Sequence, residues 1–290
     1  MNDTNATLRN YLVLMRLDKP VGSLLLLWPT LATLWMAAEG FPGLLLVVVF
    51  TVGTVLMRSA GCVINDYADR RIDAHVHRTA ERPLATGRVT PKQALGLFAA
   101  LVACAALLLP LLNWPARWLA VAGLIIAMIY PFMKRWTHMP QVVLGAAFSW
   151  GMPMGWAAVT GSLDPVVGLM FVGSLVWIVA YDTLYAMVDR EDDLRIGVKS
   201  TAILFGSLDR LIVGLLQIMA LAAFALAGQR LGYGVYYLGG LAAMAGCFAY
   251  QQFLIRKREG PGCFAAFKNN VWAGFCLFAG TVAQTQAPAL

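Results

Sequence analysis

Two acid-rich segments carry the residues of this chain that are best suited to chemistry. The first covers residues 65–73 and the second residues 182–193, and together they hold eight of the fifteen carboxylates. At helical spacing, each segment places several carboxylates on one face of a helix. Such a cluster repels itself unless cations bridge it, and hard oxygen ligands suit Mg²⁺ whose shell is completed by substrate phosphates. The two segments therefore predict a diphosphate site.

The candidate metal ligands share this helical spacing. They are Asn65, Asp66, Asp69, Asp73, Asp182, Asp189 and Asp193, with Asp192 as an alternative to the last. A single Asp at a helix end is usually a cap or a solvated residue. Two such clusters, each directly after an apolar run, favour the metal site over that simpler interpretation.

Basic residues near the two segments could complete the charge compensation of a diphosphate. The candidates are Arg70, Arg71, Arg82, Lys134, Arg135 and Lys199. Each of them could equally be present only to set the orientation of a membrane protein. Lys134 and Arg135 are the better candidates, because they directly follow the expected helix end at residues 130–133.

A diphosphate site at the edge of a membrane indicates a lipid-linked substrate. Loss of diphosphate from an allylic prenyl chain leaves a carbocation, which aromatic faces stabilise and from which water must be excluded. Tyr67, Tyr181 and Tyr185 lie next to the acids and could serve. Packing or hydrogen bonding is the alternative role for each of them.

The elements that must position these residues are membrane-spanning helices. The chain is 60% hydrophobic and 13% charged, with a mean hydropathy of +0.69, whereas soluble domains carry about 25% charged residues. Apolar runs long enough to cross a bilayer predict nine helices in a single domain covering residues 1–290. They are expected near 21–38, 43–64, 94–113, 116–132, 140–160, 164–186, 210–228, 232–253 and 270–287.

The distribution of basic residues predicts the orientation of these helices. Nineteen Lys and Arg residues fall in the N-terminal tail and alternate connections, and only Arg117 and Arg230 fall in the others. This split follows the positive-inside rule and predicts a cytoplasmic N-terminus with both acid clusters on the cytoplasmic side. The net charge of +7 is thus explained by topology, and a nucleic-acid partner is not expected.

The residues resemble a known family. Residues 65–73 fit the NDxxDxxxD signature of the UbiA-type intramembrane prenyltransferases, and residues 189–193 fit their second DxxxD signature. Further stretches resemble the 4-hydroxybenzoate polyprenyltransferase branch of ubiquinone biosynthesis. They lie at residues 16–22, 27–30, 57–62, 130–135, 180–187 and 197–201.

The resemblance implies an all-α bundle of nine helices around a central cavity in the bacterial inner membrane. It implies Mg²⁺ held by Asp69, Asp73, Asp189 and Asp193, with Asn65 and Asp66 alongside. The reaction implied is transfer of a polyprenyl group from polyprenyl diphosphate to 4-hydroxybenzoate, ortho to its hydroxyl, with release of diphosphate. The active site would open to the cytoplasm, and the membrane lipid is the expected surrounding; no particular protein partner is indicated.

An aromatic acid in an apolar cavity needs a cation for its carboxylate. Arg58, which lies within an expected span, and Arg16 are the candidates, while Arg135 could bind either the diphosphate or the aromatic acid. The full set of expected substrate-binding residues is Arg58, Arg16, Lys134, Arg70, Lys199 and Tyr185. Alternative functions are prenylation of dihydroxynaphthoate, homogentisate or haem, or a cation-coupled transporter, which would place its ionisable groups near the bilayer midplane.

Overall fold

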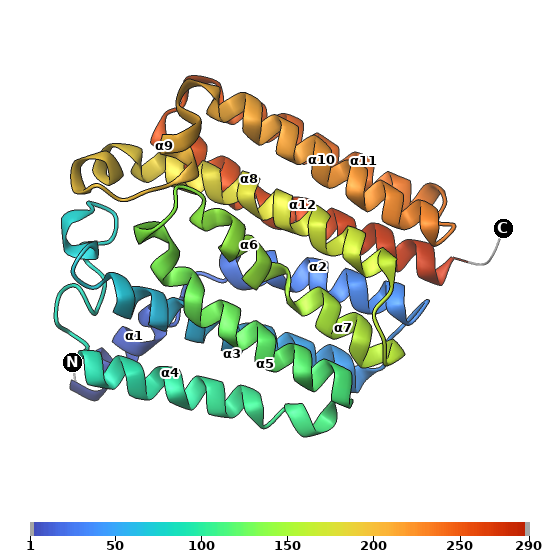
Figure 1. The fold of residues 1–290 in the computed structure, drawn as a ribbon, viewed down its shortest axis with the longest axis horizontal. Helices are drawn as coiled ribbons and strands as arrows, with labels where there is room; N and C mark the ends of the chain where they lie inside the picture. Colours follow the sequence, from blue (N-terminus) through green and yellow to red (C-terminus); the bar gives the residue numbers. More distant parts are fainter. Residues whose placement is uncertain (1–2, 288–290) are drawn as a thin grey trace.

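The computed structural model describes residues 3–287, and within that range the side chains of all residues except 3–5, 75 and 134. The described residues form helices joined by short connections, and none of them is in a strand (Figure 1). The α-helices are α1 (Asp3–Leu14), α2 (Val21–Ala37), α3 (Leu44–Asp69), α4 (Pro91–Ala106), α5 (Trp114–Ile129), α6 (Pro140–Ser149), α7 (Gly151–Thr160), α8 (Pro165–Ile196), α9 (Thr201–Phe205), α10 (Asp209–Arg230), α11 (Val235–Leu254) and α12 (Gly260–Gln286). The short 3₁₀ helices are η1 (Asp73–His75), η2 (Leu109–Leu111), η3 (Tyr130–Arg135), η4 (Gly206–Leu208) and η5 (Ile255–Lys257).

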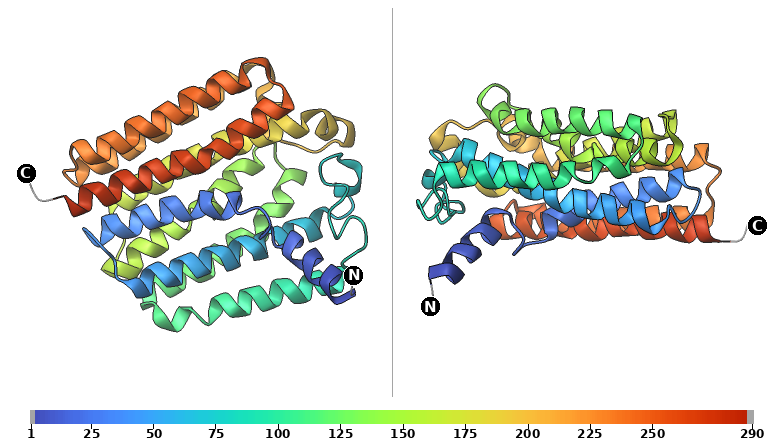
Figure 2. Two further views of the ribbon diagram at one scale, coloured as in Figure 1. Left: turned by 180° about the vertical axis from the view of Figure 1, so that it is seen from behind. Right: turned by 90° about the horizontal axis from the view of Figure 1, so that it is seen from below.

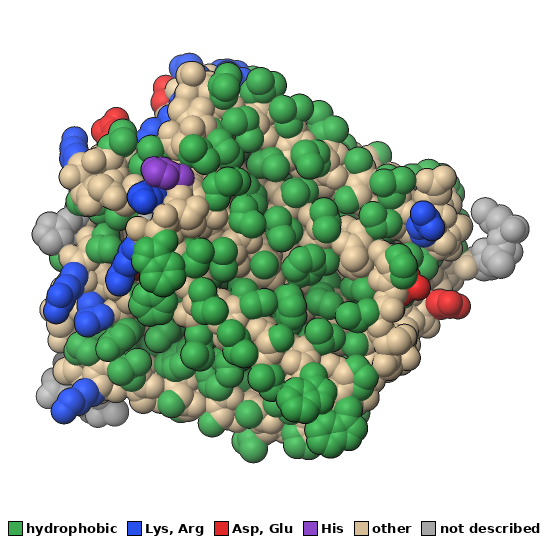
Figure 3. Space-filling model, in the orientation of Figure 1, with side chains coloured by type: hydrophobic (Ala, Val, Ile, Leu, Met, Phe, Trp, Pro, Cys, Tyr) green, Lys and Arg blue, Asp and Glu red, His purple; other side chains and the backbone are tan. Residues whose placement is uncertain are grey.

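Seven helical segments within the described residues are long and apolar enough to cross a membrane. Helix α2 is apolar but has only 17 residues, and α12, which carries Lys268, Asn269 and Asn270, is not among the seven. The expected all-α membrane fold is confirmed, while the count of nine spans stays a prediction. Many large apolar side chains face outward along the bundle, as a lipid-facing surface requires (Figure 3).

The long helices run side by side, and the short extramembrane segments gather at one end of the bundle. Helix α1, the connection after α3 and helix α9 lie at this end, whereas α12 finishes at the opposite end (Figures 1 and 2). On the face drawn in Figure 3, most Lys and Arg side chains collect at the same end as α1. On this face, the basic residues therefore lie mainly at one end of the bundle.

Helix α8 is the central element of one half of the bundle. It packs against α10, α6 and α12 and contributes Trp177 and Tyr181 to the largest apolar core. The indole Nε1 of Trp177 donates to Oδ1 of Asn270 over 2.7 Å, so a polar atom buried between α8 and α12 has its partner. This packing holds α8 rigidly beside the site described below.

Helices α3, α8 and α12 extend well beyond their expected spans, α12 by beginning at Gly260, and the expected span at 140–160 is interrupted. Helix α3 continues to Asp69, and α8 continues for ten residues beyond 186 before Gly197 ends it in the left-handed conformation (φ 71°). The span at 140–160 is divided at Trp150. Pro153 explains this division, because it has no N–H to donate to the carbonyl of Ser149, where α6 ends.

Candidate active site at one end of the bundle

The first acid motif lies at the end of α3, where the helix leaves its apolar span. Asp66 and Asp69 occupy the last two turns of α3 and are each 1% exposed, and Asp73 follows on η1 with 5% exposure. Because helix α3 runs on through the motif, the expected helical spacing of Asp66 and Asp69 is realised. Buried carboxylates are costly unless they are paired, so their partners define the site.

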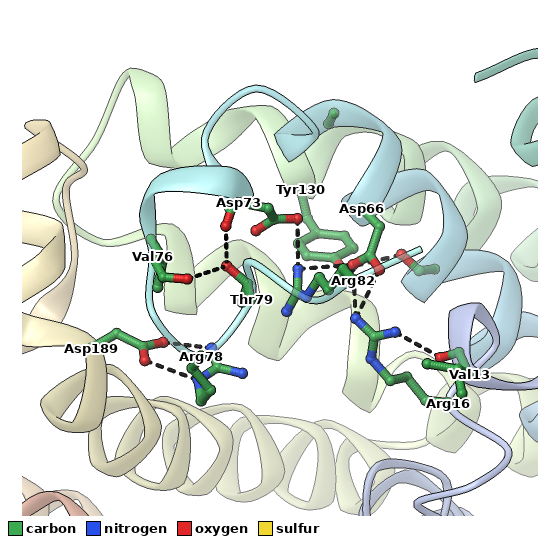
Figure 4. Close-up of polar contacts among 12 residues, drawn as sticks. Val13, Arg16, Asp66, Asp73, Val76, Arg78, Thr79, Arg82, Tyr130 and Asp189 are labelled. Carbon is green, nitrogen blue, oxygen red and sulfur yellow. Dashed lines mark hydrogen bonds and ion pairs between the residues drawn. The ribbon is translucent and has the colours of Figure 1, made fainter. Parts of the chain in front are cut away.

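Arginines from two other segments bind this motif. The Nη1 atom of Arg82 lies 2.9 Å from Oδ1 of Asp66 and 2.9 Å from Oδ2 of Asp73. Arg16, from the segment between α1 and α2, places Nη2 at 3.0 and 2.8 Å from the two oxygens of Asp66, while its Nη1 donates to the carbonyl of Val13 over 2.7 Å. Figure 4 shows Asp66 between the two guanidinium groups. Two carboxylates thus converge on one cationic nitrogen.

Charge at the motif remains incompletely compensated. Burial, and to a lesser extent the carboxylates of Asp66 and Asp69, raise the pKa of Asp73 to about 6, although Arg82 opposes this shift. Burial by itself would lower the pKa of Arg82, but Asp66 and Asp73 more than offset it, so that this pKa is raised. The motif is therefore an anionic site that favours additional positive charge.

The second acid motif lies on the last turns of α8 and is joined to the connection after α3. Nε of Arg78 lies 2.9 Å from Oδ1 of Asp189, and its Nη2 lies 2.5 Å from Oδ2 (Figure 4). The backbone N–H of His77 donates to Oδ2 of Asp192 over 3.1 Å. The guanidinium of Arg78 also lies over the ring of Tyr185, 4.4 Å from its centroid. The two motifs, far apart in sequence, therefore belong to one site.

The donor set suits a hard divalent cation. No three His, Cys, Asp or Glu residues within the described part of the chain are close enough to form a ready-made metal site. However, the convergence of Asp66 and Asp73 on a single positively charged nitrogen shows that their oxygens can surround one cation. Carboxylate oxygens are what Mg²⁺ prefers. The assignment of the seven expected metal ligands stays a prediction.

Among these expected ligands, Asp182 lies apart from the two motifs. It precedes Asp189 by two helical turns, or about 10 Å along the axis of α8. Its carboxylate forms a hydrogen bond with Gln141, and its charge interacts with that of Arg58. Asp182 is thus associated with the inner end of the site, whereas Asp189 lies at its outer end.

The other expected phosphate-binding residues contact the backbone around the first motif. Nη2 of Arg135 donates to the carbonyl of Ala68 over 2.8 Å, which places this arginine beside Asp69. Arg70 donates to the carbonyl of Tyr67 over 2.6 Å and lies over its ring at 4.4 Å. Lys199 reaches the carbonyl of Trp136 at 3.5 Å. The side chain of Lys134 lies outside the described residues.

A largely apolar cavity of about 230 Å³ lies within the bundle, and on α3 its lining ends at Gly61, before the first acid motif. Its lining comes mainly from α2–α7, and its polar members include Arg58 and Tyr130. The Cζ atom of Arg58 lies 5.3 Å from the centroid of the Phe148 ring, and the Arg58 Nε is buried without a hydrogen-bond partner among the described residues. A guanidinium on the wall of an apolar cavity is suited to an anionic ligand group.

One residue of the site, Arg78, was not among those expected from the sequence. Arg82 was expected, but only as one of several basic residues near the acids. The sequence did contain a signal for a shared role of Arg78 and Arg82, because they are four residues apart in the polar segment between α3 and α4. Only their ion pairs with Asp189 and with Asp66 and Asp73 distinguish them from the other basic residues.

Comparison with known proteins agrees with this site. Residues 26–278 match the UbiA prenyltransferase family. The chain is 55% identical over 273 residues to the 4-hydroxybenzoate octaprenyltransferase of Ectopseudomonas mendocina (strain ymp), covering 94% of this chain and 92% of that protein. It is 54% identical to the enzyme of the same name from Vibrio cholerae (strain ATCC 39541), covering 94% and 96% of the two chains.

Solved structures share the same fold. The apo structure of a UbiA homolog from Aeropyrum pernix K1 superimposes with a TM-score of 0.80 at 25% identity, covering 90% of this chain and 97% of that chain. A UbiA homolog from Archaeoglobus fulgidus bound to GPP and Mg²⁺ gives a TM-score of 0.70 at 17% identity, covering 93% and 99%. With the family match over most of its length and close relatives over nearly all of it, this chain belongs to the UbiA prenyltransferase family.

Proposed function

We propose that this chain is a membrane-embedded 4-hydroxybenzoate polyprenyltransferase acting in ubiquinone biosynthesis. It transfers a polyprenyl group from polyprenyl diphosphate to the ring carbon ortho to the hydroxyl of 4-hydroxybenzoate and releases diphosphate. The relatives at 53–55% identity bear the name of this activity. The observation that carries the proposal is the junction of two acid motifs, held by Arg78 and Arg82, in a bundle that also holds an apolar cavity lined by Arg58 of the same helix α3.

The carboxylates of the two motifs, together with the amide oxygen of Asn65, would hold Mg²⁺. We assign this role to Asn65, Asp66, Asp69, Asp73, Asp189 and Asp193, and we place Asp182 with the acceptor end because of its distance along α8. Bound Mg²⁺ supplies the positive charge that neutralises the diphosphate and makes it a better leaving group. The A. fulgidus homolog solved with GPP and Mg²⁺ supports this metal.

The arginines of the connection after α3 complete the diphosphate site. Arg78 and Arg82 already lie at the carboxylates, so that a diphosphate bound there comes within reach of their N–H groups. Arg135 lies beside the first motif at Ala68 and donates to the same group. The neighbouring Arg70, Lys134 and Lys199 add positive charge. Charge-assisted hydrogen bonds of this kind hold an anion in one orientation.

The apolar cavity receives the prenyl chain and keeps water from the reacting carbon. When the bond between the first prenyl carbon and the diphosphate oxygen breaks, the electron pair leaves with the diphosphate. The ring carbon of the acceptor then forms the new carbon–carbon bond and loses its proton, which restores the aromatic ring. Tyr130 lines the cavity together with Arg58 and offers an aromatic face to the allylic cation. Phe148 and Tyr185 instead carry the guanidinium groups of Arg58 and Arg78 on their rings.

Arg58 binds the carboxylate of the aromatic acceptor. The place of its guanidinium on the cavity wall supports this role, since a carboxylate in an apolar cavity must be paired. Arg16, by contrast, is already paired with Asp66, which supports a role in organising the first motif. The acceptor thus lies deeper than the diphosphate, with its reactive carbon toward the acid motifs.

The chain is an integral membrane protein, and we place it in the bacterial inner membrane as one transmembrane domain. The N-terminus and the active site face the cytoplasm in this proposal. The collection of basic side chains at the end that holds α1 and both acid motifs supports this orientation (Figure 3).

An assay in membranes tests the function directly. Membranes containing the protein would receive a polyprenyl diphosphate, Mg²⁺ and, in separate reactions, 4-hydroxybenzoate, dihydroxynaphthoate, homogentisate or haem, with product mass as the readout. We expect prenylated 4-hydroxybenzoate as the main product. Membranes containing the Asp69→Ala variant provide the background. A larger yield with another acceptor would contradict the proposal.

A further inference from the structure

Gly22, near the start of α2, lies directly against the guanidinium of Arg58. An ideal Cβ built on Gly22 would be 2.5 Å from Arg58 Nε, 2.6 Å from Nη2 and 3.0 Å from Cζ. Real Cβ atoms essentially never approach other heavy atoms this closely. Gly22 lies within a regular helix, so the absence of a side chain, and not an unusual backbone conformation, is what matters at this position.

The distances show which part of the guanidinium Gly22 covers. The Cβ position is almost equally close to Nε and Nη2 and farther from Cζ, so it lies at the edge that joins these two nitrogens and not over the flat face. The face is next to Phe148, whose ring centroid is 5.3 Å from Cζ. Gly22 and Phe148 therefore hold the group from two sides.

Covering this edge explains why Nε is buried without a hydrogen-bond partner. Arginine usually binds a carboxylate through two parallel N–H groups, either from the Nε and Nη2 edge or from the two Nη atoms at its end. With the backbone of Gly22 against the first edge, only the end of the guanidinium remains for a ligand in the cavity that Arg58 lines.

We propose that Gly22 is a positioning residue that determines how the acceptor carboxylate is recognised: it closes one edge of Arg58 and directs the Nη end toward the cavity. This inference rests on the proposed function, because it assigns the carboxylate to Arg58. Gly22 lies on α2 and contacts neither the proposed metal ligands nor the diphosphate, yet in this proposal it sets the selectivity of the site for an acidic acceptor.

The Gly22→Ala variant tests the proposal. The added methyl group meets the far end of a flexible side chain, so Arg58 can move aside and the fold is retained. The moved guanidinium no longer presents its Nη end correctly, and the KM for 4-hydroxybenzoate is expected to rise about tenfold, because a charge-assisted hydrogen bond is weakened. The KM for polyprenyl diphosphate is expected to stay within about twofold.

Gly96→Ala is the matched control. Gly96 lies inside helix α4, outside the lining of the cavity, and a Cβ there meets no atom within 4 Å. It makes the same substitution within a helix without touching the guanidinium or the cavity. A second readout is the preference for 4-hydroxybenzoate over the uncharged 4-hydroxybenzamide, measured as a ratio of kcat/KM, which is expected to fall in Gly22→Ala and to remain in Gly96→Ala.

The Arg58→Lys background separates positioning from general damage. The shorter ammonium side chain has no planar edge for Gly22 to cover, so Gly22→Ala is expected to have little effect in this background and to fold even if the single variant does not. An unchanged acceptor KM in Gly22→Ala, or an equal rise in the Arg58→Lys background, would overturn the proposal. Failure of the proposed function is distinguishable, since the wild-type protein would then not prenylate 4-hydroxybenzoate at all.

Discussion

Arg78 and Asp189 form a two-point ion pair, with Nε 2.9 Å from Oδ1 and Nη2 2.5 Å from Oδ2. This pair joins the connection after α3 to the last turns of α8, and it is partly exposed, with 30% and 13% of the two side chains accessible. The two acid motifs are thus held at one site in part by charge. Because Asp189 is also a proposed Mg²⁺ ligand, a bound metal ion would share this carboxylate with Arg78.

Replacing Arg78 is expected to weaken binding of the prenyl diphosphate. In Arg78→Ala, the substrate loses a charge-assisted donor worth about 1.5–3 kcal/mol, so its KM is expected to rise roughly ten- to hundredfold with little change in the acceptor KM. Arg88→Ala is the control, because Arg88 lies in the same connection and faces the exposed Glu81 at 3.6 Å. Equal effects of the two variants would show that only the total charge of the connection matters.

Each acid motif is expected to be essential. Asp69→Ala or Asp189→Ala removes a metal ligand from a group of residues that acts as a unit, so the turnover number is expected to fall by roughly two orders of magnitude or more. Asp18→Ala, at an exposed position between α1 and α2, is the control. The amount of folded protein in the membrane is measured in parallel. Near-normal rates in both motif variants would identify the motifs as solvated helix ends.

Removal of divalent cations is expected to stop the reaction. The site gathers carboxylates whose mutual repulsion needs a bridging cation, so treatment with excess chelator is expected to abolish turnover and added Mg²⁺ to restore it. Product formation is followed before chelation, after it and after readdition. Full activity after exhaustive chelation would reject the diphosphate site.

Arg58→Leu is expected to affect the acceptor more than the prenyl donor. The carboxylate of 4-hydroxybenzoate loses its charged partner in an apolar cavity, and its KM is expected to rise roughly ten- to hundredfold, whereas the diphosphate keeps its other cations. Separate KM values for the two substrates provide the measurement. A raised donor KM beside an unchanged acceptor KM would move Arg58 to the diphosphate end.

The orientation in the membrane can be tested independently of activity. A reporter inserted at Pro42 or Gly161 is expected outside the cytoplasm, and one placed after Arg78 or Arg258 is expected inside. The reason is that the N-terminal tail and the connections containing Arg78 and Arg258 belong to the set that carries nineteen basic residues. Reporter pairs that are active only on one side of the membrane give the readout. The reverse pattern would place the acid motifs outside the cytoplasm.

The sequence by itself determined the membrane fold and the chemistry of the site. Apolar length, the separation of basic residues and the helical spacing of Asp66 and Asp69 are properties of neighbouring residues along one helix, so they can be read without knowing what the helix touches. The extension of α3 to Asp69 and of α8 past Asp189 preserves that spacing, which is why the two motifs were recognisable.

Only the tertiary structure decided which residues meet. Arg78 contacts a residue 111 positions away, and Gly22 covers the guanidinium of Arg58, relations that no local pattern contains. Asp182 shares a helix face with Asp189, but the packing of α8 against α6 brings it to Gln141. Hydropathy and spacing indicate which face of a helix is polar. The partner of each polar atom depends instead on how separate helices pack, and those partners determine how the site works.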